Sequence, residues 1–239
     1  MGKEPFNGFP RECPVFYEQL SENNDKTWFE SHKSEYEKWV LHPARDFIFE
    51  IGQKLKLEVP HLIADARINR SLFKIHRDVR FSKDKKPFKT HLGIWFWEGE
   101  GKRMDCSGFY FHIEPKLFLV AAGIHLMPQE FLPEFRNSLV HEKYGIEIRS
   151  IVDHLKKDGY SVGESHYKKV PRGFSPSHLN SDLLLHNSLT ASYLQDTLPE
   201  DLYSEKIISL CLEHYRKMLA LHFWMRDMAE RAKASFNKK

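Results

Sequence analysis

Residues 107–124 read SGFYFHIEPKLFLVAAGI, and this stretch decides the fold. Aromatic and β-branched residues crowd both halves, and the pair Pro115-Lys116 separates them as a connection between two strands would. Residues 90–99, THLGIWFWEG, have the same character and run into the glycine-containing EGEGK. We therefore expect three consecutive antiparallel strands, over residues 90–99, 107–115 and 117–124.

The second of these strands has two different faces, because successive side chains of a strand point to opposite sides. Phe109, Phe111 and Ile113 share an apolar face, which we expect to be core and to be covered by helices from both ends of the chain. The opposite face is more polar and consists of Gly108, Tyr110, His112 and Glu114.

Helical patterns lie on both sides of the strands. Before them, Asp25 or a neighbouring Asn can cap TWFESHKSEYEKWV, and Pro43 suits the first turn of PARDFIFEIGQKL. After them come PQEFLPEFRNSLVHE, then GIEIRSIVDHLKKDG up to Gly159, a short strand in SLTASYL and a long helix from about Pro199. Helices, a meander and helices again predict an α+β fold, an antiparallel β-meander sheet flanked by N-terminal and C-terminal helices.

Composition indicates a soluble globular protein of one or two domains, with 239 residues, 41% hydrophobic and 29% charged. Cys13, Cys106 and Cys211 form no C-x-x-C pair, which favours buried thiols in a reducing compartment. The first residues carry no apolar signal-peptide core, and the longest apolar run is too short to span a bilayer. We expect a cytoplasmic protein without membrane contact; the sequence sets no oligomeric state.

The basic excess of the chain is concentrated in residues 76–91, HRDVRFSKDKKPFKTH. Six Lys and Arg minus two Asp give this stretch a balance of +4, whereas the whole chain has 36 minus 33, or +3. Acidic residues alternate with basic ones, and Phe81 and Phe88 are positioned to anchor the segment. The pattern therefore predicts an ordered loop in which both rings are buried.

This stretch resembles the signature of a family of conserved hypothetical proteins from bacteria and fungi, domain-of-unknown-function family 2461. The family pattern is close to R-D-x-R-F-S-x-D-K-x-P-Y-K-T, and the chain departs from it by having Phe88 in the Tyr position, so that a hydroxyl is missing. FYFHIEP followed by AAG, Arg136, VPRGF at residues 170–174 and the opening LSENNDKTWFESHKSEY also fit. The resemblance implies a single domain over residues 1–239 and brings no established activity.

An anion site is the first chemical hypothesis. Arg offers a planar fork of donors that matches phosphate or carboxylate oxygens, and Lys adds a mobile charge. In this hypothesis Asp78 and Asp84 orient the arginines. Alternatively, the charges form a structural salt-bridge network, and Arg172 in VPRGF caps a helix or pairs with Asp182. The candidate anion-binding residues are Arg77, Arg80, Lys83, Lys85, Lys89 and Arg172.

The second hypothesis concerns His112 and Glu114, which share a strand face with Tyr110. Tyr110 and His112, like Asp78 and Asp84, are candidates for orienting a ligand or transferring a proton. A metal site would use the same imidazole and carboxylate, but no H-E-x-x-H signature occurs, and fourteen histidines make chance pairs common. We therefore predict no metal and no cofactor, and interpret His112 as a hydrogen-bonded sheet residue.

Three function classes remain. In the first class, the protein binds a small anionic ligand, as an enzyme or otherwise. In the second, the loop contacts nucleic-acid phosphates. In the third, the chain is a non-enzymatic scaffold with a structural salt-bridge loop. The near-neutral remainder of the chain disfavours a broad nucleic-acid surface.

Overall fold

The computed structural model describes residues 5–236 and has an α+β fold. Its six-stranded antiparallel sheet has the strand order β1-β2-β3-β4-β6-β5. Three strands follow one another in chain and sheet: β2 (Leu92–Glu98), β3 (Gly108–Glu114) and β4 (Leu117–Ile124). The predicted meander is therefore confirmed. Two short strands form the edges of the sheet, β1 (Leu62–Ile63) and β5 (Ser161–Val162), and the sequence pattern did not indicate them. Strand β6 (Leu189–Gln195) matches the strand expected in SLTASYL.

The chain divides into two compact units. The first comprises the described part of Met1–Phe96 with Tyr110–Val120 and Leu194–His214, and the second comprises Trp97–Phe109, Ala121–Tyr193 and the described part of Tyr215–Lys239. Neither unit is one continuous segment, because β2, β3, β4, β6 and the last helix each contribute residues to both. The sequence-based expectation of a single domain stays a prediction.

The first unit begins with the predicted helical segment. It consists of α1 (Glu12–Glu22), α2 (Lys26–Ser31), α3 (Lys33–Tyr36), a π-helical turn (Glu37–Leu41) and α4 (His42–Leu55). Asp25 caps α2, since its carboxylate accepts a hydrogen bond from the backbone N–H of Trp28 at 3.0 Å. Pro43 lies in the first turn of α4, where its missing N–H costs nothing.

Burial along β3 follows the expected alternation. Phe109, Phe111 and Ile113 are buried, whereas Tyr110, His112 and Glu114 are half-buried. In the first unit, Phe111 packs against Phe47 of α4, with ring centroids 4.5 Å apart. The apolar face of the strand is therefore core, as predicted.

Helix α7 (Lys206–Phe236) packs on the same apolar face within the second unit. Its Tyr215 and His222 rings lie 5.1 Å and 4.6 Å from the ring of Phe109. Helices from both ends of the chain therefore contact this face of β3, which confirms the expectation. A short 3₁₀ turn, Glu200–Tyr203, precedes α7 near the predicted start.

The second unit also holds α5 (Leu132–Val140), preceded by the 3₁₀ turn Gln129–Phe131, and α6 (Glu142–Lys157). Gly159 follows α6 with φ +86°, a conformation that glycine adopts without strain. The buried amide of Asn180 donates to the backbone oxygens of Leu139 and Gly145, both at 2.8 Å, which satisfies carbonyls at the junction of α5 and α6. Two more 3₁₀ turns span Arg103–Asp105 and Leu183–Leu185.

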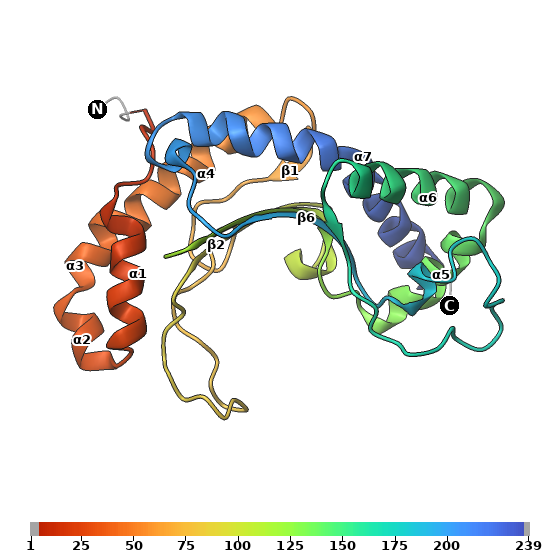
Figure 1. Ribbon diagram of the computed structural model, residues 1–239, viewed down its shortest axis with the longest axis horizontal. Coiled ribbons are helices and arrows are strands. Elements are labelled where there is room, and N and C mark those ends of the chain that lie inside the picture. The colour runs from red at the N-terminus through yellow and green to blue at the C-terminus, as the bar shows by residue number, and fades with distance from the viewer. Residues whose placement is uncertain (1–4, 237–239) are drawn as a thin grey trace. The chain divides into compact units, whose positions relative to one another are not determined.

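The basic stretch leaves the sheet as a long two-stranded arm (Figure 1). His76 and Phe88 form an antiparallel bridge, and the N–H of Arg77 donates to the oxygen of Pro87 at 2.8 Å. Phe88 is buried and stacks on Phe29, with ring centroids 4.3 Å apart. We call residues 75–89 the basic arm.

The expectation that both phenylalanines of the basic arm are buried is wrong for Phe81. This side chain is 96% exposed at the tip, where the guanidinium of Arg80 lies 5.8 Å from its ring centroid. The reason is geometric: the tip extends beyond the last backbone pairing of the arm.

Among residues 5–236, no helix is both long and apolar enough to cross a membrane.

Candidate functional site

The tip of the basic arm pairs its arginines with its own aspartates. Arg80 donates to Asp78 in a fork, from Nε to Oδ1 at 2.9 Å and from Nη2 to Oδ2 at 2.6 Å. Arg77 Nη1 donates to Asp84 Oδ2 at 2.6 Å. The side-chain bond from Arg80 lowers the pKa of Asp78 to about 2. The acidic residues therefore orient the arginine forks, which both the anion hypothesis and the salt-bridge alternative anticipated.

The lysines of the arm differ in their surroundings. Lys85 Nζ donates to the backbone oxygen of Val79 at 3.0 Å, which closes the tip, and Lys83 is exposed. Lys89 lies at the root of the arm, with its ammonium 5.1 Å from the centroid of the Phe73 ring. The predicted anion-binding residues of the arm thus separate into a tip group and one root residue, Lys89.

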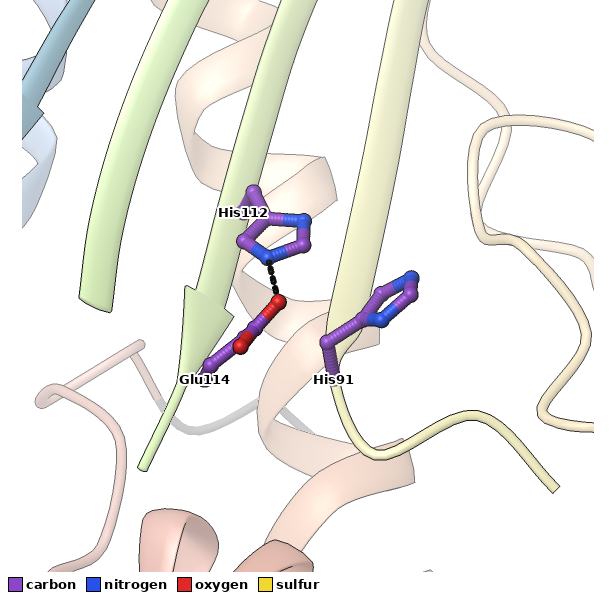
Figure 2. A group of neighbouring side chains, drawn as sticks. All are labelled: His91, His112 and Glu114. Carbon is purple, nitrogen blue, oxygen red and sulfur yellow. Dashed lines mark hydrogen bonds and ion pairs between the residues drawn. The ribbon is translucent and has the colours of Figure 1, made fainter. Parts of the chain in front are cut away.

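The root of the arm adjoins a compact group of ionisable side chains on the polar face of the sheet. His91 directly precedes β2, and His112 and Glu114 lie on β3 (Figure 2). His112 Nε2 is 2.9 Å from Glu114 Oε1, and the rings of His91 and His112 are 4.6 Å apart. One ligand atom from each of the three residues lies within 4.8 Å of the other two. We call these three residues the His–His–Glu cluster.

Tyr110 extends the cluster along β3. Its hydroxyl is 2.9 Å from His112 Nδ1, so that both ring nitrogens of His112 have a partner. Gly93 makes room for the phenol, because a Cβ at this position would be 2.9 Å from the Tyr110 oxygen. The ring of Phe73 meets that of Tyr110 edge-on at 6.2 Å. The side chain of His112 is consequently held in one orientation.

Burial sets the protonation of this cluster. It lowers the pKa of His91 to about 4, with smaller contributions from His112 and Lys89. Burial also lowers the pKa of His112, against the opposing effect of Glu114, and raises the pKa of Tyr110 to about 12. At neutral pH the site therefore presents two neutral imidazoles and a protonated phenol beside the carboxyl group of Glu114. Such groups can hydrogen-bond a ligand, relay a proton or coordinate a metal ion.

Arg172 lies in the second unit, where it is exposed on the turn that follows Pro171. Asp182, its suggested partner, instead forms an ion pair with Arg149 of α6. Arg149 also donates to the side chain of Asn180 at 2.9 Å. Asp182, one of the two structural partners suggested for Arg172, is therefore engaged by another arginine, and the suggested helix cap stays a prediction.

A buried serine–histidine–glutamate row in the second unit was missed from the sequence. Ser107 Oγ is 3.0 Å from His222 Nδ1, and His222 Nε2 is 3.1 Å from Glu98 Oε2, which also accepts from Arg226 at 3.2 Å. This order of contacts resembles a hydrolytic triad. However, Ser107 is 1% exposed and His222 0%, so no substrate carbonyl can reach the hydroxyl. We interpret the row as a structural network that joins β2 and the residue just before β3 to α7.

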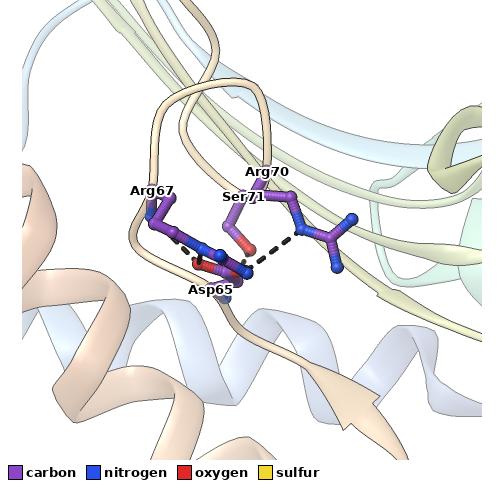
Figure 3. A network of polar contacts seen from close by, with 4 residues as sticks. All are labelled: Asp65, Arg67, Arg70 and Ser71. Atoms are coloured by element: carbon purple, nitrogen blue, oxygen red, sulfur yellow. Dashed lines mark hydrogen bonds and ion pairs between the residues drawn. The ribbon is translucent and has the colours of Figure 1, made fainter.

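A second network that the sequence did not reveal braces the loop ahead of the basic arm (Figure 3). Asp65 accepts from Arg67 Nη2 at 2.6 Å and from Arg70 Nε at 3.1 Å, and Ser71 Oγ accepts from the Asp65 N–H at 3.0 Å. The Arg67 hydrogen bond holds the pKa of Asp65 well below its usual range. Because all of these contacts are local, we assign this network to loop rigidity.

His91 is the main site residue that sequence reasoning did not select. A signal was available, since residue 91 precedes the first strand and His112 lies on the second. Selecting His91 required knowing the register in which these two strands pair, and the sequence pattern does not give that register.

Comparison with known proteins identified one family. The model of the conserved hypothetical protein family DUF2461 matches residues 12–224. No curated protein and no solved structure matched the chain.

Proposed function

This chain belongs to the DUF2461 family of conserved hypothetical proteins, and from that premise we propose that it binds a small ligand bearing a phosphate or carboxylate group. The proposed site is the His–His–Glu cluster with Tyr110 and Lys89. The description of the family carries no activity, so that the proposal is based on the side chains at this site.

The single observation that carries the proposal is the convergence of polar groups on an otherwise apolar meander. His112 is within hydrogen-bonding distance of the Tyr110 hydroxyl and of Glu114, both at 2.9 Å, and the ligand atoms of His91, His112 and Glu114 lie within 4.8 Å of one another. Lys89 is close enough to lower the pKa of His91. Ligand sites typically combine apolar surroundings with a few converging polar groups of this kind. A cation beside them selects a negatively charged ligand.

The basic arm supports the same class of ligand in a different way. Its arginines already hold Asp78 and Asp84, yet the segment keeps the local balance of +4. A concentrated positive field raises the local concentration of anions and their rate of association. We propose that the arm attracts the ligand, and that the residues at its root bind it.

The test is an NMR titration of the full chain with inorganic phosphate and with succinate, in buffer containing EDTA. Saturable shifts should be centred on residues 89–91 and 110–114. Lys89→Ala should weaken binding at least about tenfold, the range for losing a charge-assisted hydrogen bond. Lys38→Ala removes an exposed lysine of the same unit and should change nothing. Shifts confined to residues 78–86, or none at millimolar anion, would refute this placement.

One observation favours a second candidate, contact with single-stranded nucleic acid. The exposed ring of Phe81 stands beside Arg80 and amid lysines at the arm tip, and exposed aromatic rings in basic surroundings stack on bases. Binding of a fluorescent oligonucleotide should then weaken steeply with salt and be lost in Phe81→Ala. Phe49→Ala, which removes a 47% exposed ring on α4, is the matched control. Equal binding by both variants would exclude stacking at the tip.

A further inference from the structure

We propose that His91, His112 and Glu114 form a binding site for one divalent transition-metal ion of the zinc or iron(II) type. His91 immediately precedes β2 and the other two residues lie on β3, and the three ligand atoms lie within 4.8 Å of one another (Figure 2). The inference rests on the proposed function and gives it a chemical centre, because a bound divalent ion adds positive charge beside Lys89 and so strengthens the binding of an anionic ligand.

The distance between two of the ligands already suits a shared ion. Donor atoms that each lie about 2.0–2.1 Å from one metal are about 2.9–3.4 Å apart when the angle between them is near 90–109°. His112 Nε2 and Glu114 Oε1 are 2.9 Å apart. The third ligand, His91, immediately precedes β2 and is partly exposed; its ring nitrogen lies within 4.8 Å of the other two ligand atoms, and we propose that its side chain rotates to complete the site.

The donor types narrow the choice of ion. Two imidazoles and one carboxylate suit zinc, iron(II) or cobalt(II), whereas calcium and magnesium prefer sets made of oxygen alone. Three protein ligands also leave coordination positions for water or substrate, as in catalytic sites. With one carboxylate against a divalent ion, the centre keeps a net positive charge, to which Lys89 adds.

The neighbours of the cluster fit this role. Histidine ligands usually donate their second ring N–H to a partner that fixes the ring. His112 Nδ1 lies 2.9 Å from the Tyr110 hydroxyl, whose oxygen can accept a hydrogen bond from Nδ1–H while Nε2 faces the metal. Tyr110 is itself held between Gly93 and Phe73. Tyr110 is therefore a positioning residue for the site.

The experiment is a titration of EDTA-treated, dialysed full-length protein with Co²⁺, followed by visible absorption and by calorimetry, with Zn²⁺ as competitor. One equivalent should bind, with the absorption of an imidazole- and carboxylate-ligated ion. His91→Ala, His112→Ala and Glu114→Gln should each weaken binding at least about tenfold, and Tyr110→Phe by about 10–100-fold. Because Glu114→Gln keeps the side-chain shape, it tests the site even where an alanine variant unfolds.

Surface histidines are the main competing explanation, since the chain has fourteen. His61→Ala removes an exposed histidine of the same unit and should leave Co²⁺ binding unchanged. Absence of a saturable equivalent, or equal affinity in the cluster variants and in His61→Ala, would overturn the metal site. Succinate titrations with and without the ion separate the two proposals. If succinate binds in EDTA but no metal ion binds, only the metal site is refuted. If the metal ion binds but succinate binds under neither condition, only the proposed anionic ligand is refuted.

Discussion

At the scale of the residue, Gly93 is the position at which one added atom should disturb the site. A Cβ there would lie 2.9 Å from the Tyr110 hydroxyl and 3.3 Å from the Phe73 ring. We expect Gly93→Ala to push the phenol away from His112 and to cost about 1–3 kcal/mol of unfolding free energy through overpacking. Urea denaturation of Gly93→Ala, Tyr110→Phe and the double variant measures this. Because Phe lacks the clashing oxygen, the double variant should recover part of the loss; strict additivity would mean that the phenol is not the obstacle.

At the scale of the element, the basic arm should depend on one asparagine for its attachment. Asn24 accepts from the N–H of Phe88 and donates to its oxygen, both at 3.0 Å. Removing the amide leaves two part-buried backbone groups without that partner, which we expect to cost about 1–3 kcal/mol in Asn24→Ala. Amide hydrogen exchange should then accelerate at Arg77 and Lys89, whose N–H groups pair across the arm. Asn23→Ala is the control, since that side chain bonds only within its own segment.

Helix α7 is a second element with a specific dependence, in this case on pH. Burial lowers the pKa of His222, and the hydrogen bond from His222 lowers the pKa of Glu98. In both cases the unfolded chain takes up protons at a higher pH than the folded chain, so acid favours unfolding. The unfolding free energy should therefore fall as the pH drops below about 6.5, the ordinary histidine pKa, and fall further below about 4.5 as Glu98 titrates.

The contribution of His222 to this dependence can be isolated by substitution. His222→Gln should flatten the decrease in unfolding free energy between pH 7 and pH 5, measured by urea denaturation at each pH. His166→Gln changes an exposed histidine of the same unit and should leave the slope as in the parent protein. A slope that is identical in all three proteins would show that His222 is not buried in its neutral form.

At the scale of the whole molecule, the prediction of a single domain can be tested by unfolding. Five elements pass from one unit to the other along the chain, which favours one cooperative transition. Phe111→Ala in the first unit and Phe135→Ala in the second each remove a fully buried ring, and each should cost about 3–5 kcal/mol. Both variants should lower the same calorimetric transition. Two transitions, each sensitive to only one variant, would mean that the units are separate domains.

The family match also concerns the molecule as a whole. It covers residues 12–224 and so includes parts of both units. It confirms the resemblance inferred from RDVRFSKDKKPFKT, and it leaves the function to be established at the site itself.

Local physical chemistry explains what the sequence determined by itself. The alternation of Phe109, Tyr110 and Phe111 defines two strand faces, because the period of a strand is two residues wherever it lies. Asp25 caps its helix through contacts within three residues. The meander, the helices on both sides and the charge of the basic arm could all be predicted from such short-range patterns.

Only the tertiary structure decided what each polar residue contacts. His91 and His112 are 21 positions apart in the chain, and they meet because two strands pair in one register, which depends on packing along the whole sheet. For the same reason Glu98 and His222 could not be linked from their positions in the sequence. Phe81 was expected to be buried because it is apolar, but burial requires a surface to pack against, and the position of the arm tip supplies none.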